Sequence, residues 1–119
     1  SEDRWENLAS RPVLKRYSAY TANYAAEREG RFLDLMAQEA PNDLRDQVLN
    51  CGERVRDQTA EPVLAAYGAL AEVDDQRGLL LSFAFSDSPA GHLTDYMVWA
   101  WPLGTCSTRL EYTTGELDE

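Results

Sequence analysis

A change in hydrophobic periodicity near residue 75 constrains the fold of this chain more than any other feature. Before this point, apolar residues recur every three or four positions, which is typical of helices, and after it they alternate every second position, which is typical of strands. The two parts meet at the turn-forming sequence Asp74-Asp75-Gln76-Arg77-Gly78. A run of helices followed by a run of strands predicts an α+β fold.

Two helices are predicted in the first part. The first begins at Ser10 and Pro12 and carries Tyr17, Tyr20 and Tyr24 on one face; it continues through Gly30 or breaks there, and ends before Pro41. The second begins at residues 41–43, with an apolar face formed by Leu44, Val48, Cys51 and Val55. Because the linker is very short, we expect an antiparallel helical hairpin.

A third, shorter helix is predicted from Thr59 or Glu61 to Leu70. Strands are predicted at residues 79–86 and 96–101, and a third strand near Leu110 and Tyr112. The segment 87–94 between the first two strands is long enough for an open loop. The expected architecture is an N-terminal helical hairpin plus a short helix, packed on a small C-terminal antiparallel β-sheet.

The chain has 119 residues, which predicts a single domain with acidic, frayed ends at 1–9 and 115–119. Twenty-one Asp and Glu against eleven Lys and Arg give a net charge of -10. This charge argues against binding to nucleic acid or to anionic membranes, and no stretch is long and apolar enough for a membrane span. The acidity serves solubility alone, or it attracts a basic partner.

Cys51 and Cys106 are the two cysteines, and their even number predicts a disulfide. A bond would indicate a periplasmic or secreted protein, whereas two buried free thiols would indicate the cytoplasm. Ten of the eleven basic residues are Arg, a bias that points to a bacterial source. The sequence contains no zinc-ligand set, and its dispersed glycines form no nucleotide-binding motif, so no metal or other cofactor is expected.

His92 is the only histidine, so any Ser-His, Cys-His or His-ligand chemistry depends on it. It lies in the polar loop between the predicted strands, where Asp87 and Asp95 could join it in a weak metal site. Because no catalytic motif surrounds His92, we expect a solvated loop residue whose replacement by Ala leaves activity unchanged.

Aromatic residues on the predicted Trp strand are the candidate binding residues: Tyr96, Trp99 and Trp101. They serve the core if the helical tyrosines pack on them. A narrow sheet covered by helices on one face would instead leave Tyr96 or Trp99 exposed, and exposed aromatics are enriched at binding hot spots.

These patterns predict a non-enzymatic protein-binding domain, such as an inhibitor or immunity protein for a basic partner. The alternative is a small-ligand carrier or sensor domain, with the ligand held between the tyrosine helix and the Trp strand. A small hydrolase dependent on His92 is the third hypothesis. Partner identity and oligomeric state do not follow from the sequence.

Overall fold

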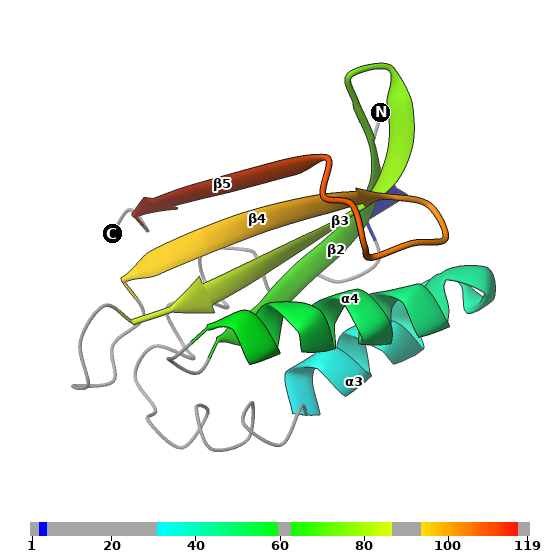
Figure 1. Ribbon diagram of the computed structural model, residues 1–119. Coiled ribbons are helices and arrows are strands. Elements are labelled where there is room, and N and C mark those ends of the chain that lie inside the picture. Colours follow the sequence, from blue (N-terminus) through cyan, green and yellow to red (C-terminus); the bar gives the residue numbers. More distant parts are fainter. Residues whose placement is uncertain (1–2, 5–30, 60–62, 87–93, 117–119) are drawn as a thin grey trace.

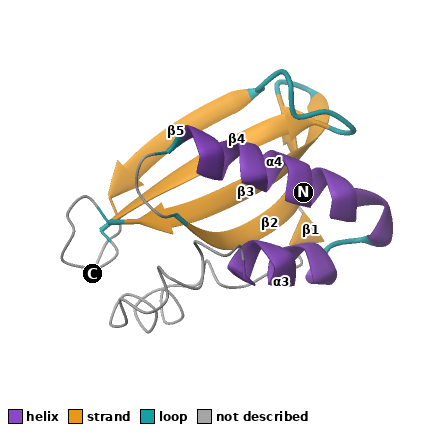
Figure 2. Ribbon diagram, turned by 60° about the horizontal axis from the view of Figure 1, so that its bottom comes forward, coloured by secondary structure: helices purple, strands orange, loops and turns teal. Residues whose placement is uncertain are grey.

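The protein forms an antiparallel sheet with two helices on one of its faces (Figures 1 and 2). This computed structural model describes residues 3–4, 31–59, 63–86 and 94–116. The sheet has five strands in the order β1-β2-β3-β4-β5, and every neighbouring pair is antiparallel. The elements are β1 (Asp3–Arg4), α3 (Arg31–Glu39), the 3-10 helix η1 (Asn42–Leu44), α4 (Arg45–Gln58), β2 (Leu64–Val73), β3 (Gln76–Phe85), β4 (Asp95–Pro102) and β5 (Glu111–Glu116). The predicted α+β class is confirmed.

Helices α3 and α4 lie side by side and bury their apolar faces against the sheet (Figure 2). The predicted face of the second helix is confirmed, because Val48, Cys51 and Val55 are fully buried. Gly52 is also buried, and a Cβ there would collide with the side chain of Leu33 on α3. The absence of a side chain at Gly52 therefore lets the two helices approach closely. Most of the predicted first helix, including its tyrosines, lies outside the described residues.

The core fills the space between the helices and one face of β3 and β4. Cross-strand pairs on this face join Leu79 to Trp101, Leu81 to Trp99 and Phe83 to Met97, and all six side chains are buried. The opposite face is buried at small residues, which are Ala69, Ser82, Ala84 and Ala100. The period-two pattern of the sequence therefore separates a bulky, buried helix-side face from an opposite face whose fully buried residues are small and whose larger residues, Leu80, Tyr96 and Val98, are half-buried.

The third predicted helix is wrong, because residues 64–73 form strand β2. Its alanines favour a helix by intrinsic propensity, but the segment pairs with β3 along its whole length. A shift of register between Ala65 and Tyr67 marks a β-bulge. The extra residue breaks the alternation that identifies a strand, so the sequence lacked its usual signal.

The turn predicted at Asp74 and Asp75 is confirmed, although it joins two strands rather than a helix to a strand. Both residues have positive φ, at 51° and 65°, in a two-residue connection between Val73 and Gln76. Positive φ at both central positions is the mark of a type I′ hairpin turn, whose twist matches that of the flanking strands.

The three predicted strands are present as β3, β4 and β5. Strand β1 was not predicted, and it places two residues of the N-terminal end beside Leu70 and Ala69 of β2. Strand β5 extends to Glu116, past the predicted start of the frayed C-terminal end. Among the described helices, none is long and apolar enough to span a membrane.

Candidate functional site

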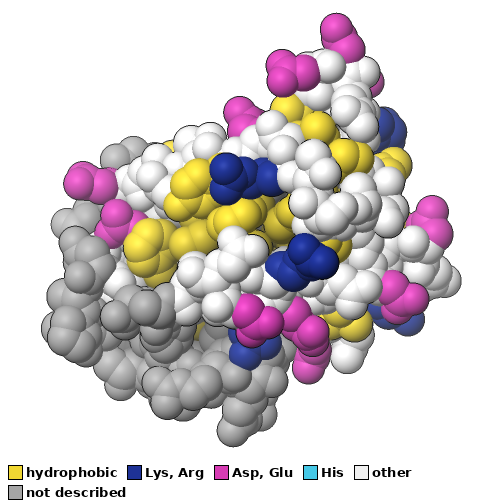
Figure 3. All heavy atoms as spheres, viewed as in Figure 1, with side chains coloured by type: hydrophobic (Ala, Val, Ile, Leu, Met, Phe, Trp, Pro, Cys, Tyr) yellow, Lys and Arg dark blue, Asp and Glu magenta, His cyan; other side chains and the backbone are white. Residues whose placement is uncertain are grey.

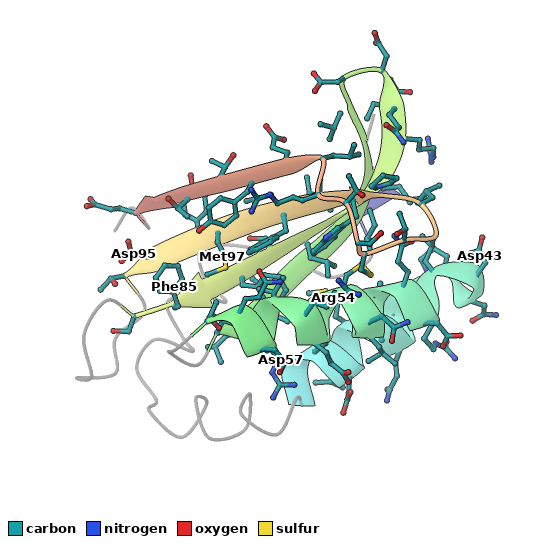
Figure 4. All side chains as sticks on the ribbon, viewed as in Figure 1. Asp43, Arg54, Asp57, Phe85, Asp95 and Met97 are labelled. Carbon is teal, nitrogen blue, oxygen red and sulfur yellow. A yellow bond between two sulfur atoms is a disulfide. The ribbon has the colours of Figure 1, made fainter. Side chains whose placement is uncertain are left out.

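A hydrophobic band crosses the sheet between α4 and β5, on the face that carries the helices (Figure 3). We define the hydrophobic band as Phe85, Met97, Trp99 and Tyr112, which the strand registers place on this face. Phe85 and Met97 lie at the end of the band near Asp95 (Figure 4). Arg54 lies on the side of the band formed by α4 (Figure 4). The outer part of the sheet is thus left accessible beside α4.

Aromatic rings and one guanidinium form the centre of this surface. Trp99 stacks on Trp101 with ring centroids 5.9 Å apart, and it meets Tyr112 edge to face at 4.8 Å. The Arg109 guanidinium carbon lies 5.3 Å from the Trp99 ring centroid and 5.0 Å from that of Tyr112. Trp99 is 8% exposed and Tyr112 is 44% exposed. Tyr112 and Arg109 therefore form an accessible layer over a buried Trp99.

The indole of Trp99 is fixed within the strand that carries it. Its Nε1 donates a hydrogen bond to Sδ of Met97 at 3.0 Å, which satisfies the ring's only polar group. Tyr112 stands directly opposite Trp99 in the ladder between β4 and β5. A rigid aromatic support under an exposed Tyr and Arg is the composition found at interface hot spots.

An open pocket of about 480 Å³ lies next to the hydrophobic band, between α4 and the connection from β4 to β5. Its α4 side carries Asn50, Glu53, Arg54 and Asp57, and its other side is formed by residues 104–107. Glu53 and Asp57 are exposed and one helical turn apart, so their carboxylates project from the same side of α4. This arrangement suits a positively charged side chain from a partner.

The connection that forms this pocket is fastened to α4 by Gln47. The Gln47 Nε2 donates to the carbonyls of Pro102 at 2.8 Å and Thr105 at 3.0 Å, and its Oε1 accepts from the Gly104 amide at 3.0 Å. Gln47 is 8% exposed, so a buried polar side chain is satisfied entirely by loop backbone.

The disulfide between Cys51 and Cys106 fastens the same loop one helical turn further along α4, which confirms the predicted bond. The two Cα atoms are 5.2 Å apart, and the cysteines are 55 residues apart in sequence. Cys51 is fully buried and Cys106 is half-buried at the edge of the pocket. We call Gln47 and the disulfide together the loop clamp.

Charged side chains surround the hydrophobic band and the pocket, and acids outnumber bases among them. The acids are Glu53, Asp57, Asp95 and Glu116, and the bases are Arg54 and Arg109. Four carboxylates against two guanidiniums give this part of the surface an excess negative charge. Such a surface attracts a cationic partner during association.

The three predicted binding residues lie on two different faces of β4. Trp99 and Trp101 are on the helix side, where Trp101 is only 2% exposed and its ring stacks against that of Trp99. Tyr96 is half-buried on the opposite face, where its ring lies where a Cβ on Gly115 would be placed. The structure therefore does not bring Tyr96 into the surface around Trp99.

Sequence reasoning missed most of the residues that are accessible at this surface. The spacing of Leu110 and Tyr112 predicted a strand, but Tyr112 was not among the predicted binding residues. Arg109 lies in a turn without periodicity, and its position over Trp99 follows from the ladder of β4 and β5. Glu53 and Asp57 share helical spacing with many exposed acids, so no pattern distinguished them.

Other predicted features lie outside the described residues. His92 and Asp87 are among them, so the solvated-loop interpretation of His92 stays a prediction. Across residues 3–4, 31–59, 63–86 and 94–116, no three His, Cys, Asp or Glu side chains are grouped so as to hold a metal ion. Comparisons with protein-family models, curated proteins and solved structures found no match.

Proposed function

We propose that this chain is a non-enzymatic protein-binding domain that recognises a basic partner through the surface between α4 and β5. The observation that carries the proposal is the layer of Tyr112 and Arg109 over the buried Trp99, bordered by carboxylates. Tyr, Trp and Arg are the residues most enriched at binding hot spots, and a preordered aromatic support limits the entropy lost on binding.

An inhibitor or immunity-type role is the version that fits these features best. Such a protein covers a cationic surface of its target, and the acidic border would speed that encounter while the aromatic centre slows dissociation. A periplasmic or secreted location is part of the proposal, and the bond between Cys51 and Cys106 supports it, because disulfides persist in oxidising compartments.

The proposal is tested by selecting binders from a random peptide library displayed on phage. Wild-type protein should enrich peptides rich in Lys and Arg with an aromatic or aliphatic residue. Tyr112→Ala should weaken their binding by about 2 kcal/mol, because it removes the exposed member of the cluster. Leu35→Ala is the matched control, because Leu35 has the same exposed fraction, 44%, but lies on α3.

The dependence of binding on salt separates the contribution of the acidic border from that of the aromatic centre. Raising ionic strength to physiological values shortens the Debye length to about 8 Å, so association of a basic peptide should slow while its dissociation changes little. Equal binding by wild type and Tyr112→Ala would contradict the proposed surface. Selected peptides without an excess of basic residues would contradict the proposed partner chemistry.

A further inference from the structure

Strand β5 is an edge strand with an exposed outer side. It is last in the strand order, and no described strand pairs with the side that faces away from β4 (Figure 1). It has six residues, Glu111–Glu116, and all of them are exposed except Gly115, which is half-buried. Alternate residues of an antiparallel edge strand direct their backbone N–H and C=O groups outward, where another strand can pair with them.

The charges at the two ends of β5 discriminate between possible strands. Pairing of β5 with a second copy would bring together two strands that each carry Glu111 and Glu116 and no basic residue. Like charges on neighbouring strands repel, and each chain carries a net charge of -10. A strand with Lys or Arg opposite Glu111 and Glu116 would instead form two favourable cross-strand pairs.

The two faces of β5 give the remaining features of a complementary strand. Tyr112 and Thr114 lie on the helix-side face, in register with Trp99 and Met97. An added strand would therefore place an apolar side chain beside Tyr112, at the border of the hydrophobic band. On the opposite face, the ring of Tyr96 occupies the space where a Cβ on Gly115 would lie, so an aromatic residue paired with Gly115 would be placed beside that ring.

We propose that β5 binds an extended basic segment of the partner protein as a sixth, antiparallel strand. This inference rests on the proposed function, because it specifies how the basic partner engages the same surface. Backbone hydrogen bonds to the outer edge of β5 supply affinity, and side chains on alternate positions supply specificity, as in other cases of strand addition. Glu111 and Glu116 favour the cationic segment over a second, equally acidic copy of β5.

The probe is the synthetic peptide acetyl-Arg-Phe-Thr-Val-Ile-Lys-amide, whose basic ends face Glu116 and Glu111 in the antiparallel register. It is titrated into the full chain while the backbone amide signals of residues 111–116 are followed by NMR and hydrogen exchange. We expect shifts and new protection in β5. A peptide with N-methyl groups on alternate amides, on the side that pairs with β5, should lose this binding, because it cannot form the ladder.

Matched variants test the charges. Replacing Glu111→Gln and Glu116→Gln together should weaken binding of the basic peptide about fivefold, through loss of two cross-strand charge pairs. Replacing Asp43→Asn and Asp46→Asn together removes the same charge from exposed positions in η1 and in the first turn of α4, and should have little effect.

Three results would overturn strand addition. The first is the absence of any change in β5 at millimolar peptide, and the second is equal binding of the N-methylated peptide. The third is a wild-type dimer in sedimentation with protected β5 amides, which would assign the edge to a second copy. Library peptides that lose binding to Tyr112→Ala but leave the β5 amides unchanged would support the proposed function while rejecting this mode of binding.

Discussion

Gln47 should be one of the most sensitive polar positions in the described part of the protein. It is a nearly buried side chain on α4 that makes three hydrogen bonds to the backbone of the connection between β4 and β5. Gln47→Ala removes two donors and one acceptor at once. It leaves the carbonyls of Pro102 and Thr105 and the amide of Gly104 without their partner.

The expected loss follows from the environment of each bond. A net contribution of about 1 kcal/mol for each hydrogen bond gives about 3 kcal/mol for the set. Gly104 is exposed and Thr105 is half-buried, so water can replace part of what is lost. We therefore expect a loss of about 2 kcal/mol in the free energy of unfolding, with a fall in Tm of roughly 8 °C for a domain of this size.

Urea unfolding without reductant measures this loss while the disulfide stays closed. Gln58→Ala is the matched control, since Gln58 is exposed on the same helix, and it should change stability by less than about 0.5 kcal/mol. The slope of unfolding free energy against urea should be unchanged in both variants. If Gln47→Ala is no more destabilising than Gln58→Ala, the hydrogen bonds to the loop do not stabilise the fold and the reasoning is wrong.

Gln47→Glu tests the same site through pH. The carboxylate retains an acceptor for Gly104 but faces the carbonyls of Pro102 and Thr105, so burial and these dipoles should raise its pKa in the folded state above its value in the unfolded chain. When the folded pKa of an acid is raised, the stability of the variant falls as pH rises through the interval between the two pKa values. Gln47→Glu should therefore be less destabilised at pH 4 than at pH 8, relative to wild type. Equal destabilisation at the two pH values would show that the introduced carboxyl is solvated.

The remaining predictions concern the disulfide and the β2–β3 turn. Replacing Cys51 and Cys106 together by Ala should cost up to about 4 kcal/mol in urea unfolding, because the bond closes a loop of 55 residues; a loss below about 1 kcal/mol would mean that the unfolded state gains little freedom. Asp75→Gly should stabilise the protein by about 1 kcal/mol, read as a higher Tm, because Asp75 has φ of 65° and Gly adopts this conformation without strain. A lower Tm for Asp75→Gly would show that the Asp75 side chain stabilises the turn.

Local patterns were sufficient for the elements whose periodicity is regular. The face of α4 and the alternation of β3 and β4 follow from apolar spacing, since each buries one regular set of side chains. Strand β2 could not be recognised in this way. Its bulge shifts the alternation, and Ala65, Ala66, Gly68 and Ala69 are all buried, a run that resembles a buried helix as much as a strand.

The candidate site was less predictable than the fold because it depends on contacts between distant segments. Gln47 is next to Val48 on a helix, and nothing local indicates that its amide meets a loop more than fifty residues away. Arg109 acquires its position only when β5 pairs with β4 and brings Tyr112 opposite Trp99. Predicting these contacts needs the strand register, which the sequence specifies only through burial of one face.

The loop clamp connects the stability of the fold to the proposed binding surface. The connection between β4 and β5 carries Arg109 and sets where β5 begins, and Gln47 and the disulfide hold this connection against α4 at two adjacent turns. A free edge strand and an exposed aromatic cluster would lose conformational freedom on binding if they were mobile. Because the clamp orders one end of β5 beforehand, less of this entropy remains to be lost when a partner strand pairs. The loop clamp therefore supports the proposed binding surface, because a β5 edge that is already ordered binds a partner strand with a smaller loss of entropy.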